Sequence, residues 1–109
     1  MWKDIWQNKG KNLKNTDFSM IDLLKMNGYD TSGDALSVQG WVDYTHYIAN
    51  VLQVCSGDKS LLEVGCGGGA FLKVLSSINT NLRIYGIDYS NTLIEIAKCV
   101  IKNGEFFLR

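Results

Sequence analysis

The sequence has 109 residues, of which 46% are hydrophobic and 20% are charged, a balance typical of a folded globular chain rather than a disordered one. A chain of this length predicts one domain with a core of modest size. The 11 basic residues equal the 11 acidic ones, so the formal net charge is zero and no overall field favours nucleic acid or an anionic membrane.

The three cysteines, Cys55, Cys66 and Cys99, form no CxxC pair, and any disulfide framework would leave one of them over. This cysteine usage suits a reducing compartment. The N-terminal residues lack the apolar stretch of a signal peptide, and no apolar run is long enough to cross a bilayer. With a single histidine, His46, the sequence also predicts no zinc site. We therefore expect a cytoplasmic protein.

The first part of the chain, residues 1–40, is polar and is predicted to be a segment of helix and loop. Residues 18–26 (FSMIDLLKM) have the three-to-four spacing of a short amphipathic helix, and Gly28 fits just beyond its end. Residues 27–34 are dense in turn formers and predict a loop. A second helix is predicted over residues 41–54. Its apolar face would be formed by Trp41, Tyr44, Ile48, Val51 and Leu52.

The second part, residues 41–109, alternates strands with helices and is predicted to be a truncated Rossmann-like domain. Residues 60–64 (SLLEV) are mostly apolar, which predicts a buried strand. For the last helix, Ser90 is a candidate N-cap and Thr92 with Glu95 forms a competing capping box. This order predicts an α/β fold with a parallel sheet and right-handed crossovers, preceded by helices. The elements expected after the first strand are a helix over 70–78, a turn over 79–81, a strand over 82–88, a helix over 91–102 and a third strand over 106–108.

Four glycines, Gly65, Gly67, Gly68 and Gly69, stand within five residues directly after the first predicted strand. A tight strand-to-helix turn favours residues that tolerate a positive φ. Without side chains, Gly65 and Gly67 would also let a ligand lie against the backbone, and the following helix would point free N–H groups at it. Open α/β sheets bind ligands at the carboxyl ends of their strands. A glycine-rich turn without any ligand is the alternative.

Two kinds of ligand fit this turn. Gly65, Gly67 and Ala70 match the G-x-G-x-x-G/A pattern, and Asp88 lies about 20 residues further on, as in a dinucleotide site. Glu63, however, begins an E-x-G-x-G-x-G string at the end of the strand. A carboxylate there would repel a pyrophosphate but suits a ligand that carries an ammonium group. Asp88 can accept hydrogen bonds from both hydroxyls of a ribose.

The stretches LLEVGCGGGAFL (residues 61–72) and YGIDYSNTLIEIAK (residues 85–98) resemble the first two motifs of class I S-adenosylmethionine-dependent methyltransferases. The likeness covers roughly residues 41–108. It implies S-adenosylmethionine as the cofactor, with the glycines against its methionine portion, Glu63 at its ammonium end, Asp88 on its ribose and Tyr89 beside its adenine. The cofactor-binding residues expected from the resemblance are Glu63, Gly65, Cys66, Gly67, Gly69, Asp88 and Tyr89. The Cys66 thiol is expected to be a small space-filler rather than a nucleophile.

Members of that family have more strands than the two and the beginning of a third that are predicted here. The resemblance therefore implies that the catalytic and acceptor-binding residues would follow Arg109, and they are unknown from this sequence. We expect an N-terminal fragment that is inactive by itself. Because a small parallel sheet has unpaired edges, we also expect self-association through those edges.

The leading functional hypothesis is a methyltransferase that acts on a small molecule. One alternative is an oxidoreductase that holds a nicotinamide dinucleotide in the glycine turn, and another is a non-catalytic module of a split or truncated methyltransferase. The neutral charge favours a metabolite over nucleic acid as the substrate. His46 is a candidate general base, although a polar position on a helix is the preferred interpretation.

Overall fold

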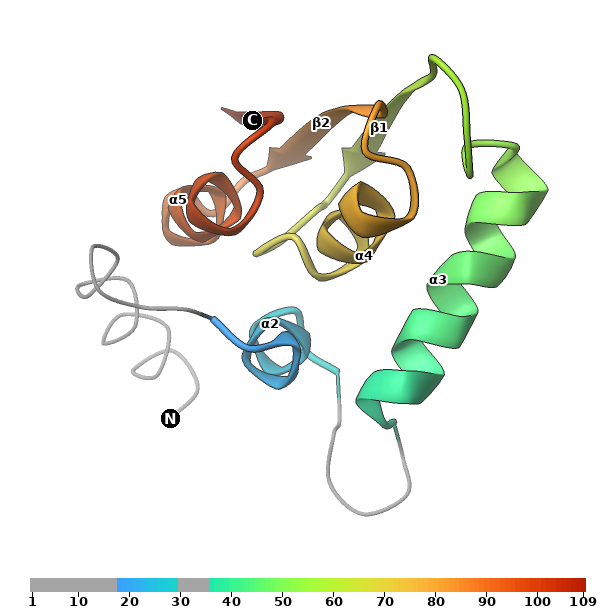
Figure 1. Cartoon of the computed structure of the whole chain (residues 1–109). Coiled ribbons are helices and arrows are strands. Elements are labelled where there is room, and N and C mark those ends of the chain that lie inside the picture. Colours follow the sequence, from blue (N-terminus) through green and yellow to red (C-terminus); the bar gives the residue numbers. More distant parts are fainter. Residues whose placement is uncertain (1–17, 30–35) are drawn as a thin grey trace.

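Three parallel strands form the centre of the structure, a computed structural model that describes residues 18–29 and 36–109 (Figure 1). The strands are β1 (Ser60–Val64), β2 (Arg83–Asp88) and β3 (Gly104–Leu108), and they lie in the order β1-β2-β3. The helices are α2 (Met20–Met26), α3 (Val38–Leu52), α4 (Ala70–Ile78) and α5 (Asn91–Val100). The predicted partial Rossmann-like fold is confirmed, and the predicted elements differ from the observed ones mainly at their ends.

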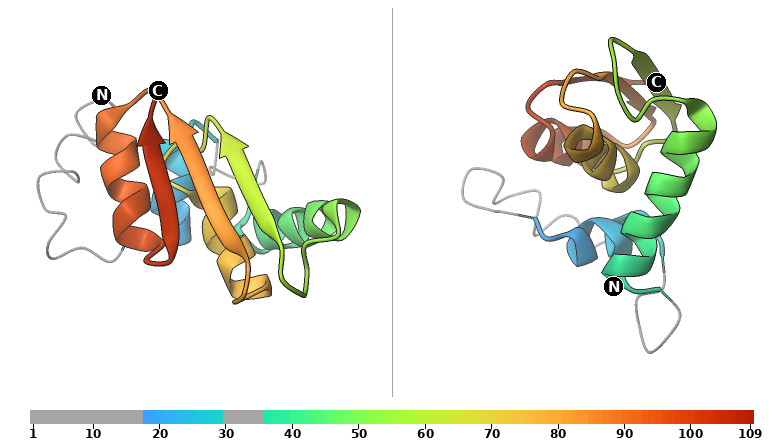
Figure 2. Two further views of the ribbon diagram at one scale, coloured as in Figure 1. Left: turned by 90° about the horizontal axis from the view of Figure 1, so that it is seen from above. Right: turned by 45° about the vertical axis from the view of Figure 1, so that its right-hand side comes forward.

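The helices gather on one face of the sheet (Figure 2). α4 connects β1 to β2 and α5 connects β2 to β3, while α2 packs on the outer side of these two helices and α3 runs alongside α4. An inner core between the sheet and the crossover helices includes Leu72, Leu75, Ile84, Ile94 and Phe106. An outer core that joins α2 and α3 to the crossover helices includes Leu23, Leu24, Met26, Trp41, Val74 and Ile96. Each such side chain contributes about 1.5–3 kcal/mol by its burial.

The opposite face of the sheet is open in the described part of the chain. Leu62 and Val64 of β1 are 53% and 78% exposed, and Phe107 of β3, on the same face, is 44% exposed. The prediction of a fully buried first strand is therefore wrong, because the described helices cover only the other face (Figure 2). Self-association through the free edges of β1 and β3 stays a prediction.

Helix α3 differs from the helix predicted over residues 41–54 in both its ends and its buried face. It begins at Val38, after the N-cap Ser37, so the predicted domain boundary between residues 40 and 41 lies inside it. Its buried residues are Trp41, Thr45 and Ala49, whereas the predicted apolar positions Tyr44, Val51 and Leu52 are exposed. Thr45 is accommodated because its hydroxyl donates a hydrogen bond to the Trp41 carbonyl. The division of the chain into residues 1–40 and 41–109 stays a prediction, and residues 1–17 lie outside the described range.

The ends of the other helices follow from specific caps. The Ser90 hydroxyl accepts a hydrogen bond from the Leu93 amide, so the prediction of Ser90 as N-cap is confirmed and the competing capping box is not used. The predicted extension of that helix to Lys102 is wrong, since it ends at Val100 and Gly104 already belongs to β3. In the described residues, no helix has the length and apolar character needed to cross a membrane.

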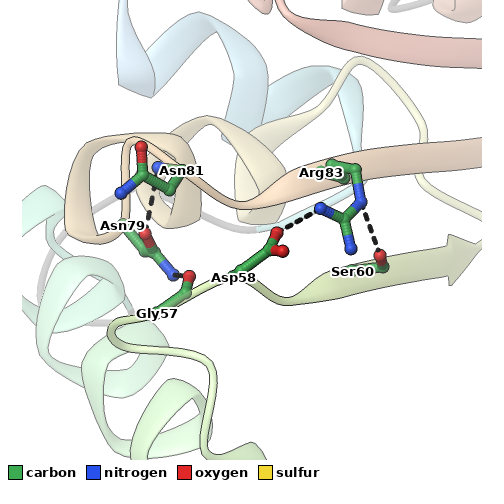
Figure 3. A network of polar contacts seen from close by, with 6 residues as sticks. All are labelled: Gly57, Asp58, Ser60, Asn79, Asn81 and Arg83. Atoms are coloured by element: carbon green, nitrogen blue, oxygen red, sulfur yellow. Dashed lines mark hydrogen bonds and ion pairs between the residues drawn. The ribbon is translucent and has the colours of Figure 1, made fainter.

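A buried asparagine ties together the segments that lead into β1 and β2 (Figure 3). The Asn79 side-chain amide donates to the carbonyls of Val54 and Gly57, both at 3.1 Å, and its carbonyl accepts from the Asn81 backbone amide at 3.0 Å. Asn79 is buried, so these bonds have no water to replace them. Nearby, Arg83 pairs with Asp58 and donates to Ser60, but both charged groups are more than half exposed.

Replacing Asn79 with alanine should lower the free energy of unfolding by about 2 kcal/mol, because the buried carbonyl of Val54 and the partly buried carbonyl of Gly57 lose their donor. The exposed ion pair should contribute little, so Asp58→Ala should cost less than about 1 kcal/mol. Urea denaturation followed by circular dichroism would compare the two variants with the wild type. Equal losses in both variants would contradict this assignment of the stabilising contact.

Candidate functional site

A pocket of about 230 Å³ opens where the carboxyl ends of β1 and β2 meet α2 and α3. Gly65 continues directly from β1, and its amide donates to the carbonyl of Ile87 in β2 at 2.7 Å, so the two strand ends are held side by side. The residues that line the pocket are Met26, Asn27, Tyr29, Trp41, Glu63, Gly65, Gly67, Phe71, Asp88, Tyr89 and Leu93. The pocket therefore lies where the sequence predicts a ligand site.

The glycine loop, residues 65–69, has a backbone that side chains would disfavour. Gly65, Gly67 and Gly69 have φ values of +75°, +58° and +94°, which lie in the left-handed region. Nothing lies within 4 Å of where a Gly65 side chain would begin, so this glycine leaves its backbone open. A side chain at Gly69 would instead meet Ile101, so that glycine allows α4 to pack closely against the end of α5.

Every backbone N–H of the glycine loop donates a hydrogen bond inside the protein. Gly65 and Cys66 share the Ile87 carbonyl, and Gly69 donates to the Cys66 carbonyl. Gly67 donates to a carboxylate oxygen of Asp88 at 3.1 Å, and Gly68 donates to the side-chain oxygen of Asn27 at 2.9 Å. The amides of residues 65–69 are therefore committed to protein acceptors, whereas the expectation of free N–H groups concerns the first turn of α4, which begins at Ala70, and stays a prediction.

Glu63 is a pocket residue whose surroundings disfavour the charged form of its side chain. By the sheet register it lies opposite Gly86, on the face covered by the helices, and it is largely withdrawn from water. Burial, together with the nearby carboxylate of Asp88, raises its pKa to about 7. Its Oε1 atom is buried without a hydrogen-bond partner among the described residues. A buried carboxylate oxygen left in this way calls for a donor or a cation beyond the described residues.

Asp88 lies at the end of β2 and is buried beside the glycine loop. One of its oxygens accepts from the Gly67 amide, and the other accepts from the Ser90 amide at 2.9 Å. Each oxygen keeps a second lone pair, so Asp88 can hold the loop and still accept from a ligand hydroxyl.

The remaining predicted site residues divide between the pocket and the core. Tyr89 lines the pocket and is 87% exposed. The Cys66 side chain is fully buried and lies toward Gly86, away from the pocket, and burial raises the pKa of its thiol to about 12. The expected space-filling role of Cys66 fits this placement. His46 is exposed on α3 and does not line the pocket.

Sequence reasoning missed the wall that α2 and α3 contribute to the pocket. The rings of Tyr29 and Trp41 lie 4.9 Å apart, and the Trp41 indole donates to the Ala70 carbonyl at the start of α4. Burial, with the Glu63 carboxylate and Tyr44 nearby, raises the pKa of Tyr29. The other missed lining residues are Met26, Asn27, Phe71 and Leu93. No spacing rule identifies Asn27 or Tyr29, because their partners lie far away in the sequence.

Comparison with known proteins shows similarity to methyltransferases in the region of the site. Residues 62–108 match a family model described as a methyltransferase domain. A curated relative, the tRNA N(3)-methylcytidine methyltransferase of Schizosaccharomyces pombe, is 36% identical over 53 residues, which make up 47% of this chain and 17% of that protein. The chain thus spans only 17% of the length of this relative.

Solved structures share the fold at lower identity. A coclaurine N-methyltransferase bound to N-methylheliamine and S-adenosylhomocysteine superposes with a TM-score of 0.60 at 21% identity, over 95% of this chain and 35% of that one. An S-adenosylmethionine-dependent methyltransferase of Methanococcus maripaludis gives a TM-score of 0.56 at 17% identity, over 87% of this chain and 43% of that one. The chain thus shares the Rossmann-like fold of these S-adenosylmethionine-dependent methyltransferases, in the three-stranded part described above, and residues 62–108 are similar to a methyltransferase domain.

Proposed function

We propose that this chain supplies the methionine and ribose side of an S-adenosylmethionine site for methyl transfer. The observation that carries the proposal is the buried oxygen of Glu63, which has no partner among the described residues and belongs to a pocket that Gly65, Gly67 and Asp88 also line. The family match supports the same cofactor. When bound, S-adenosylmethionine supplies an electrophilic methyl group on a sulfonium ion.

The residues present fit the charged end of such a cofactor. An ammonium group beside Glu63 would donate to the orphaned oxygen and favour the ionised carboxylate over the protonated one. Gly65, with open space beside its α-carbon, allows a ligand to approach the backbone closely. Asp88 is proposed to accept from the ribose hydroxyls through the lone pairs that Gly67 and Ser90 leave free. Tyr89 is proposed to pack beside the adenine, and its exposure leaves its ring available.

The nicotinamide alternative is disfavoured by the same geometry. A pyrophosphate at a glycine turn is bound by free backbone N–H groups and by the positive end of the helix dipole. Here the amides of residues 65–69 are all committed to protein acceptors. Two carboxylates, Glu63 and Asp88, also face the pocket and would repel the phosphates.

We propose a small molecule as the methyl acceptor, on the strength of the neutral net charge of the sequence. The exclusion of nucleic acid is not carried forward, because the curated relative is named as a tRNA methyltransferase. The catalytic residues, the location in the cytoplasm and the inactivity of this chain by itself also stay predictions.

Titration calorimetry with S-adenosylhomocysteine should show saturable binding by the wild-type chain, whereas NAD should give none. Asp88→Ala should weaken the binding at least about tenfold, because it removes both the ribose acceptor and the partner of the Gly67 amide. The matched control is Asp43→Ala, which removes an exposed carboxylate that accepts from Gln39 on α3. Binding of NAD with equal affinity, or equal effects of the two substitutions, would contradict the proposal.

The affinity for S-adenosylhomocysteine should depend on pH through Glu63. With a pKa of about 7 in the free protein, Glu63 is mostly protonated at pH 6 and mostly ionised at pH 8. If the ammonium group binds only the ionised form, the affinity should rise about tenfold over this interval. Glu63→Gln should bind more weakly and lose the pH dependence.

The same residue should affect stability in the opposite direction. Its pKa is raised above the ordinary value of 4.5, so the free folded protein holds this proton more tightly than the unfolded chain. The free energy of unfolding should therefore fall as the pH rises from about 4.5 to about 7, and less so in Glu63→Gln. Glu105→Gln, on exposed β3, is the control. A wild-type pH profile that Glu63→Gln reproduces would show that another group titrates.

A further inference from the structure

The C-terminal end of α2 makes direct contact with the glycine loop, although residues 20–27 lie outside the part of the chain that the family model matches. The Asn27 side-chain amide lies against the backbone of residues 66–68. Its oxygen accepts from the Gly68 amide at 2.9 Å, and its nitrogen donates to the Cys66 carbonyl at 3.4 Å. The side-chain amide of Asn27 thus connects the carbonyl of Cys66 with the N–H of Gly68, the residues on either side of Gly67.

Gly67 is shaped to receive this amide. A side chain there would begin 2.2 Å from the Asn27 oxygen and 2.7 Å from its amide carbon, so it would displace the Asn27 amide from its contacts with Gly68 and Cys66. On its other side, the Gly67 amide donates to Asp88. Gly67 is therefore held between an amide from α2 and a carboxylate from β2.

The position of Asn27 is itself firmly fixed. Asn27 is the C-cap of α2, and its backbone amide donates to the Leu23 carbonyl at 3.0 Å. Leu23, Leu24 and Met26 of this helix are buried in the outer core, against α4 and α5. Gly28, with a φ of +87°, then turns the chain away. The side-chain amide is short, and its support is rigid, so it can define the position of the loop.

We infer that Asn27 is a positioning residue of the ligand site, which fixes the peptide groups of Cys66 to Gly68 and thereby sets the floor of the pocket. This inference rests on the proposed function for its effect on ligand binding, but not for the contact itself. It makes α2 part of the site. A neutral amide suits this place, because a further negative charge would stand beside Glu63 and Asp88, and a cation would pair with them and compete with the ligand.

Amide hydrogen exchange, measured by NMR on the ¹⁵N-labelled 109-residue chain, tests the contact directly. Asn27→Ala should speed the exchange of the Gly68 amide about tenfold or more, while the Gly67 amide, held by Asp88, should change much less. Asn27→Asp keeps an acceptor for Gly68 and loses the donor to Cys66, so it should retain most of the protection of the Gly68 amide. Asn50→Ala is the matched control, since it removes an exposed asparagine that donates to a carbonyl on α3.

Calorimetry with S-adenosylhomocysteine then tests the effect on the site. Asn27→Ala should weaken binding about five- to tenfold. Asn27→Asp should also weaken binding, whereas Asn50→Ala should leave the affinity unchanged. Unchanged Gly68 exchange in Asn27→Ala, or equal loss of protection in both Asn27 variants, would overturn the inference. Faster Gly68 exchange with unchanged affinity would also overturn it, by leaving Asn27 a purely structural role. If the wild type binds no S-adenosylhomocysteine, the proposed function fails, and the exchange comparison still decides whether Asn27 holds the loop.

Discussion

The rest of this structure depends on one constraint, which is that each backbone N–H of the glycine loop needs a hydrogen-bond acceptor. Five consecutive N–H groups, from residue 65 to residue 69, find acceptors in β2, in α2 and within the loop itself. A buried N–H without a partner would cost about 1–3 kcal/mol, so the loop adopts this form only when both β2 and α2 are in place. The crevice is thus assembled by segments separated by about 40 and about 20 residues along the chain rather than by the turn alone.

This arrangement changes the charge preference that a glycine-rich turn usually has. A strand-turn-helix unit with free amides attracts anions, because the N–H groups and the helix dipole both present positive charge. Here the amides of residues 65–69 donate to protein acceptors, and the carboxyl groups of Glu63 and Asp88 line the pocket. Under the proposed function, this arrangement favours a ligand with a cationic end and with hydroxyl donors. Two ligand classes that share a sequence pattern are distinguished by where the loop amides point.

The sequence predicts the elements well where their pattern is local. The apolar run before the glycines, the spacing of α4 and the Ser90 cap all depend on neighbouring residues, and each is found within a residue or two of its expected place. The buried face of α3 was predicted wrongly because a pattern weights large apolar residues. The close approach of α3 to α4 instead selects Thr45 and Ala49, and leaves Tyr44 outside. Asn27 lies in a turn as the sequence predicts, but its contacts with Cys66 and Gly68 are not predicted, since these partners are about 40 residues away along the chain.

β1 shows most directly how the site determines the sequence. Leu62 and Val64 lie on the open face of the sheet, whereas Glu63 lies on the face that the helices cover. A strand optimised for stability alone would place its carboxylate on the open face, where water would solvate it. The chain instead keeps Glu63 in a place where burial and Asp88 raise its pKa and leave one of its oxygens without a partner. Local rules that are broken in this way are typical of functional positions, and under the proposed function a ligand that satisfies the carboxylate would offset the cost of burying it.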